Sequence, residues 1–179
     1  MTDTLDASQA VAVSTPATAP DDAGAVAFEF PHRIEFFVYG VPVQQGGKRI
    51  NRKTGSMYDQ AKSLAPWRQE VAGVAENVMA GRLPATMPCR VGLAFYFRRP
   101  TSHYRVGMHA GELKPSAPQH HAQTPDIDKL ERAILDSLTM GGVYADDRLV
   151  HTVNKVRYWT DRFHGKPGVQ IIVTPEEHR

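Results

Sequence analysis

Residues 89–97 alternate along the chain between large apolar side chains and small or polar ones. The apolar members are Val91, Leu93, Phe95 and Phe97, and the residues between them are Arg90, Gly92, Ala94 and Tyr96. A period of two is that of a strand with one buried face. The segment therefore predicts a half-buried strand, and the rest of the chain has to supply a sheet for it.

The periodicity of the other apolar segments predicts the remaining elements. Segments 33–41, 149–158 and 169–174 are rich in β-branched and aromatic residues, as strands are. Apolar residues at helical spacing predict one helix over 63–80 and a second that begins between 126 and 128 and ends at Gly141 and Gly142. The order strand, helix, strand, helix, strand, strand favours one small α+β domain.

Composition and charge limit the partners of this domain. Of 179 residues 41% are hydrophobic, which predicts a globular core over 28–179. Residues 1–27 contain four Asp and no Lys or Arg, and we interpret them as a flexible tail. The remainder has 21 Lys and Arg against 19 − 4 = 15 acidic residues, so its charge of +6 favours a polyanionic partner. Cys89 is the single cysteine, so no intrachain disulfide forms.

Two segments between the predicted elements are basic. Residues 44–58 contain four Lys or Arg with no acidic residue, and we expect a loop or hairpin. Residues 98–124 predict a long exposed loop with four histidines, which we interpret as solvated rather than as a zinc site. No apolar run is long enough to span a bilayer and no secretory signal is present, so we expect a cytoplasmic protein.

Four candidate metal ligands lie in the segment 124–150, namely Asp126, Asp128, Asp146 and Asp147. Two carboxylates two residues apart converge only if the first is extended, and Pro125 favours an extended chain before the helix. We expect the Asp146–Asp147 pair, after the glycine break, to return beside the start of the same helix. Oxygen ligands gathered in this way suit Mg²⁺, for which Mn²⁺ can substitute. The competing interpretation is a helix cap and a solvated turn.

This spaced set of residues resembles the RusA family of Holliday junction resolvases. The shared pattern is Asp-x-Asp, a basic residue four positions later, a glycine break, and Asp-Asp before a strand. The resemblance implies a small mixed sheet with two main helices, a homodimer, and a magnesium-dependent phage or prophage endodeoxyribonuclease of DNA recombination and repair. It implies catalytic roles for Asp126, Asp128, Asp147 and Arg132, with Asp146 as a further metal ligand. Family members often have Asn at position 129 and Lys at position 132, where this chain has Lys129 and Arg132.

The expected substrate is branched DNA, specifically four-way junctions, without a membrane partner or a nucleotide cofactor. The candidate phosphate-binding residues are Lys48, Arg49, Arg52, Lys53, Arg98, Arg99, Arg105 and Lys129. The departures at positions 129 and 132 leave a second hypothesis, a non-catalytic protein that binds branched DNA. A third, a glycosyltransferase that uses Asp-x-Asp, is disfavoured because no nucleotide-binding βαβ pattern is present.

Overall fold

The structure is a computed structural model that describes residues 33–46, 49–50, 57–58, 61–162 and 165–176. The predicted tail, 1–27, lies outside these residues. The strands are β1 (Ile34–Tyr39), β2 (Arg49–Ile50), β3 (Met57–Tyr58), β4 (Cys89–Phe97), β5 (Val150–Trp159) and β6 (Gly168–Pro175). The helices are α1 (Ala61–Met79), α2 (Ile127–Met140) and the short 3₁₀ turns η1 (Thr101–His103), η2 (Gly107–His109), η3 (Asp147–Leu149) and η4 (Thr160–Arg162).

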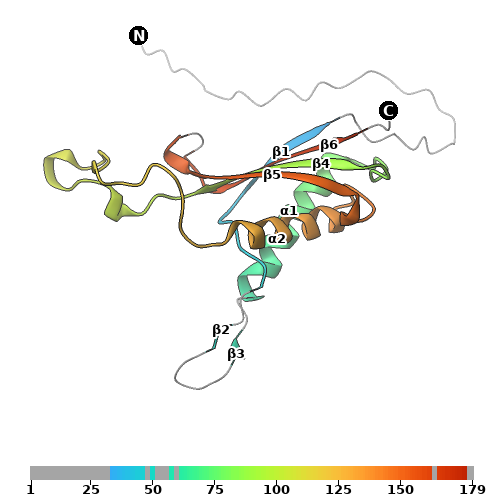
Figure 1. Ribbon diagram of the computed structural model, residues 1–179, viewed down its shortest axis with the longest axis horizontal. Helices are drawn as coiled ribbons and strands as arrows, with labels where there is room; N and C mark the ends of the chain where they lie inside the picture. Colours follow the sequence, from blue (N-terminus) through green and yellow to red (C-terminus); the bar gives the residue numbers. More distant parts are fainter. Residues whose placement is uncertain (1–32, 47–48, 51–56, 59–60, 163–164, 177–179) are drawn as a thin grey trace, which may run out of the picture.

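Four strands form one mixed sheet in the order β1-β6-β4-β5. β6 pairs antiparallel with both β1 and β4, whereas β4 and β5 are parallel. Figure 1 shows α1 and α2 on the same side of this sheet. The α+β class, the mixed sheet and the two main helices are therefore confirmed, and each predicted helix and main-sheet strand is present with ends shifted by at most two residues.

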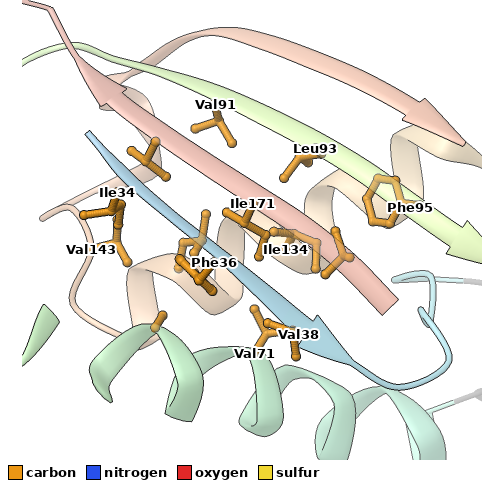
Figure 2. Close-up of a cluster of buried hydrophobic side chains, with 14 of the residues drawn as sticks. Ile34, Phe36, Val38, Val71, Val91, Leu93, Phe95, Ile134, Val143 and Ile171 are labelled. Carbon is orange, nitrogen blue, oxygen red and sulfur yellow. The ribbon is translucent and has the colours of Figure 1, made fainter. Parts of the chain in front are cut away.

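The alternation in β4 places one set of side chains under the helices. Val91, Leu93 and Phe95 are at most 2% exposed, and they share their face of the sheet with apolar residues of β1 and β6. Figure 2 shows these side chains between the sheet and the helices. Cys89 is fully buried as a small apolar residue, and the two tryptophans, Trp67 and Trp159, are also core residues.

α1 and α2 cross closely at the end of α2. A Cβ atom added at Gly141 would lie 2.7 Å from the carbonyl oxygen of Ala72 and 2.8 Å from the Cβ of Ala75. Both contacts are shorter than side chains tolerate, so the absence of a side chain at Gly141 permits this crossing. α2 itself buries the stripe Leu130, Ala133, Ile134, Ser137 and Leu138, which is the helical spacing visible in the sequence.

The two basic segments both form local structure. In the first, β2 and β3 pair antiparallel, with Arg49 opposite Tyr58, which confirms the predicted hairpin. In the second, residues 98–124, which we name the arm, project from the body (Figure 1) and contain η1 and η2. Most of the arm is exposed as expected, but His121 is 6% exposed and packs between Phe97 and Trp159, so the solvated interpretation was wrong for this histidine. No described helix is long and apolar enough to cross a membrane.

Candidate functional site

The start of α2 carries the first two aspartates. Asp126 has extended backbone angles, φ −70° and ψ 136°, and Asp128 lies in the first helical turn. The extended arrival that Pro125 predicts is therefore confirmed. Both aspartates are exposed at the surface, so both carboxylates are accessible to a ligand from solvent.

Lys129 forms an ion pair with one of these carboxylates. Its Nζ lies 2.6 Å from an Oδ of Asp126. The hydrogen bond and the positive charge of Lys129 lower the pKa of Asp126, and Asp126 in turn raises the pKa of Lys129. A cation therefore already occupies the position beside Asp126 where a metal ion would bind.

Contacts from distant segments hold the start of α2. The Gln44 side chain accepts a hydrogen bond of 2.7 Å from the backbone N–H of Asp126, and the backbone N–H of Gln45 donates to the carbonyl of Lys129. Gln44 and Gln45 belong to the segment that leads from β1 to the β2–β3 hairpin. The segment that leads from β1 to β2 is therefore attached to the start of α2.

Arg157, near the end of β5, fixes the approach to the same helix. Its Nη1 donates to the carbonyl oxygens of Gln123 and Pro125, at 2.7 and 2.8 Å. These bonds join the end of the arm to the sheet just before Asp126. The positive charge of Arg157 also contributes to the low pKa of Asp126, after the contribution of Lys129.

The second aspartate pair lies at the other end of α2. Asp146 caps η3 by accepting a hydrogen bond of 2.9 Å from the backbone N–H of Arg148. Asp146 and Asp147 line a depression of about 460 Å³ together with Arg68, Asp136, Thr139, Met140 and Ala145. Arg68 forms an ion pair of 3.4 Å with Asp136 in this depression.

The charge of Asp147 also reaches the buried Tyr144. Burial is the main cause that raises the pKa of the Tyr144 hydroxyl, and the negative charge of Asp147 raises it further. That hydroxyl donates a hydrogen bond of 3.0 Å to the carbonyl of Leu135, in the second half of α2. Asp147 is therefore placed beside the end of the helix.

The expectation that Asp146 and Asp147 return beside the start of α2 was wrong. The helix has 14 residues, and at 1.5 Å per residue it spans about 21 Å. β5 begins beside the end of α2 and only at Arg157 reaches the segment before Asp126. Among the described residues, no group of three His, Cys, Asp or Glu is arranged to hold a metal ion.

Arg132 lies one turn after Asp128 on the exposed side of α2. Residues four apart are neighbours on a helix surface, so Arg132 is the nearest arginine of α2 to the Asp128 carboxylate. Asp136, one further turn on, instead faces Arg68 of α1. The exposed face of α2 therefore carries a negative charge at Asp128 and, one turn later, a positive charge at Arg132.

The predicted phosphate-binding residues have different environments. Arg98 is exposed, and Arg105 is exposed but forms an ion pair of 2.9 Å with Glu112. Arg99 was predicted to contact DNA, but its side chain is 3% exposed and pairs with Asp161 at 3.0 Å, so it is unsuited to that role. Lys48, Arg52 and Lys53 lie outside the described residues, and of Arg49 the structure describes the β2 backbone.

Sequence reasoning missed four residues that shape these sites, namely Gln44, Gln45, Arg157 and Arg68. Their contacts join residues distant in sequence, such as Gln44 and Asp126. No local period or motif marks them. The one available signal was that two basic residues, Lys155 and Arg157, stand between Val153 and Trp159 on the face of β5 that packs on the core.

Comparison with known proteins agrees with the acidic pattern. The family model Endodeoxyribonuclease RusA matches residues 40–174, about three quarters of the chain. This range includes β2 and β3, both helices and the four candidate ligands Asp126, Asp128, Asp146 and Asp147. None of the curated proteins matches the chain. Because the family match covers most of the chain, the protein belongs to the RusA family of endodeoxyribonucleases.

Proposed function

We propose that this protein is a magnesium-dependent endodeoxyribonuclease that resolves four-way DNA junctions by paired nicking during recombination and repair. Its membership of the RusA endodeoxyribonuclease family is the observation that carries the proposal. The exposed Asp126 and Asp128, and the two hydrogen bonds that join the start of α2 to the segment before β2, support it. Four basic residues follow this segment in the sequence, within 44–58, and basic side chains suit the phosphates of DNA.

We further propose that each metal site contains carboxylates from two chains. The donor chemistry fits Mg²⁺, because Asp126, Asp128 and Asp147 are exposed oxygen ligands. One chain alone does not bring these three carboxylates together, because the length of α2 separates Asp126 and Asp128 from Asp147. Two chains with α2 helices side by side and antiparallel would bring Asp126 and Asp128 of one chain to Asp147 of the other. A two-fold axis then generates two equivalent sites.

When bound, the magnesium ion lowers the pKa of a bound water and neutralises phosphate charge. The chain's own residues bind and orient the DNA. Arg132, on the exposed face beside Asp128, stabilises the negative charge that develops on the phosphate. If a metal ion bound to Asp126, Lys129 would be displaced from it and would be free to contact a phosphate oxygen, because the two cations would compete for the same carboxylate.

One observation favours the non-catalytic alternative. The Lys129 ammonium neutralises Asp126, and a permanent ion pair there would leave a protein that binds branched DNA without cutting it. The family match favours the nuclease, and a cleavage assay decides between the two.

The test is cleavage of a labelled four-way junction beside a linear duplex of the same sequence, with Mg²⁺ and with EDTA. We expect symmetric, metal-dependent nicks in the junction only. Asp128→Asn should bind the junction with wild-type affinity and not cut it, whereas Glu76→Gln, an exposed carboxylate on α1, should cut normally. Tight binding without cleavage at any Mg²⁺ or Mn²⁺ concentration would refute the nuclease.

A further inference from the structure

The tip of the arm exposes large apolar side chains. Met108 is 99% exposed, Val106 is 85% exposed and Leu113 is 42% exposed. Isolated apolar residues are common on protein surfaces, but here three lie within residues 106–113 of the arm, which projects from the body (Figure 1). The arm therefore presents a small hydrophobic tip to solvent.

Hydrogen bonds hold this tip in a defined shape. The backbone N–H of Arg105 donates to the carbonyl of Glu112 at 2.8 Å, and that of Lys114 donates to His103 at 2.9 Å. Tyr104 and Leu113 form a bridge between these bonds. Gly107, with φ +70°, permits the turn that begins η2. The tip is thus a short hairpin and is already ordered before it meets a ligand.

The base of the arm is attached to the end of the sheet. Arg99 donates to Asp161 at 3.0 Å and to the carbonyl of Pro118 at 2.7 Å, and its guanidinium lies 5.0 Å from the ring centre of Trp159. The His121 ring packs 4.5 Å from the same tryptophan. Both ends of the arm are therefore attached to the same residue at the end of β5.

The charge of the arm indicates the ligand. Residues 98–124 contain four Lys or Arg and one acidic residue, a net charge of 4 − 1 = +3. This charge complements a polyanion and disfavours burial against a second copy of the same arm. The arm also leads directly to Asp126, because Arg157 holds Gln123 and Pro125. A ligand at the tip is therefore linked to the start of α2.

We propose that the arm inserts Met108 and Val106 between the bases at the branch point of DNA, while Arg98 and Lys114 contact the flanking phosphates. Apolar side chains act as such wedges in other DNA-bending proteins, where basic residues hold the backbone. Unstacking costs least where stacking is already interrupted, so a wedge selects a branch over a continuous duplex. This inference rests on the proposed function and assigns the recognition of the branch to the arm.

The test is a four-way junction that carries 2-aminopurine, whose fluorescence rises when it is unstacked, at the branch point. Protein is added in EDTA so that no strand is cut, and anisotropy of a remote dye reports binding. We expect the wild-type protein to raise the fluorescence severalfold. The same base analogue one helical turn from the branch should not respond.

The double variant Val106→Ser/Met108→Ser should bind about tenfold more weakly, because the apolar contact is lost, and at saturation should leave the fluorescence unchanged. Leu83→Ser, an equally polar change at a residue 53% exposed outside the arm, should behave as wild type. Binding without a fluorescence rise in the wild type, or an undiminished rise in the double variant, would overturn the inference. Loss of self-association in the double variant, measured by sedimentation, would also overturn it, because the tip would then contact protein.

The two proposals fail in different ways. Fluorescence that rises without any cleavage in Mg²⁺ would leave the wedge standing and refute the nuclease. Junction cleavage without a fluorescence rise in the wild type would refute the wedge and leave the nuclease standing.

Discussion

At position 129 this chain departs from the pattern that the resemblance leads us to expect, and the departure brings an ion pair between Lys129 and Asp126. Asn, which the resemblance leads us to expect at position 129, has no charge to pair with this carboxylate. Here Lys129 lies 2.6 Å from Asp126 and lowers its pKa. The sequence identified both residues, but it did not reveal the ion pair, since whether Lys129 faces Asp126 or solvent depends on where the helix begins.

Lys129→Asn should therefore raise the pKa of Asp126 toward its ordinary value, because the main cause of its low pKa is removed. It should also reduce the Mg²⁺ concentration needed for half-maximal cleavage severalfold, because a competing cation is gone. Carboxyl NMR titration and a metal titration of cleavage measure the two effects. Lys155→Asn removes a lysine that pairs with Glu131 instead and serves as the control. An unchanged Asp126 pKa in Lys129→Asn would contradict the assignment of the ion pair.

The elements themselves were largely predictable from the sequence. The alternation in 89–97 and the helical spacing around Leu130 and Ile134 persist in β4 and α2 because local period reports which face is buried. The arm was predicted as a solvated loop because Pro, Gly and His carry no period. The contacts of Arg99 and His121 with Trp159 join residues far apart in sequence, and no local pattern encodes them.

The close crossing of α1 and α2 gives a stability prediction. Gly141→Ala should destabilise the fold by about 2 kcal/mol, because the added Cβ meets Ala72 and Ala75 at under 3 Å. Gly73→Ala, inside α1 with nothing within 4 Å of the added Cβ, should stabilise it by about 0.5 kcal/mol. Chemical denaturation measures both. Equal effects of the two substitutions would show that the helices are not in this contact.

His121 makes the attachment of the arm dependent on pH. Burial lowers the pKa of His121 from its usual 6.5, and the positive charge of Arg157 lowers it further. As the pH falls, His121 is therefore protonated more readily in the unfolded chain than in the folded one. The free energy of unfolding keeps its full His121 contribution above about pH 6.5 and decreases as the pH falls below that value. His121→Phe should remove this contribution to the melting temperature between pH 7 and about pH 5. A difference in melting temperature between wild type and variant that stays constant with pH would contradict this prediction.

At the scale of the whole molecule, basic residues on the arm should govern salt dependence. Arg98 is exposed, and the Lys114 ammonium donates to the carbonyl of Ser102 and remains at the surface. Each phosphate contact contributes roughly one unit to the slope of log affinity against log salt. Arg98→Ala/Lys114→Ala should therefore reduce the slope for junction binding by about two. Arg82→Ala, exposed beside the end of α1, should leave the slope unchanged.

The placement of the four aspartates could be predicted only in part. Their sequence spacing and the extended Asp126 were evident, whereas the distance between the pairs depends on the direction in which the chain leaves α2. Gly141 and Gly142 end the helix, but the turn leads into β5 beside β4, so Asp147 stays at the far end. Local sequence does not encode that direction, because it follows from the pairing of β5 with β4.

The central claim, that one metal site uses aspartates of two chains, is tested most directly by mixing two inactive variants. Asp128→Asn and Asp147→Asn are each expected to cut no junction alone. In a mixed dimer, the intact Asp126 and Asp128 of one chain meet the intact Asp147 of the other, so one site is restored. We expect the mixture to recover metal-dependent nicking, confined to one strand for each mixed dimer. If the mixture stays inactive while native mass spectrometry shows mixed dimers, the site is built within a single chain and the claim is wrong.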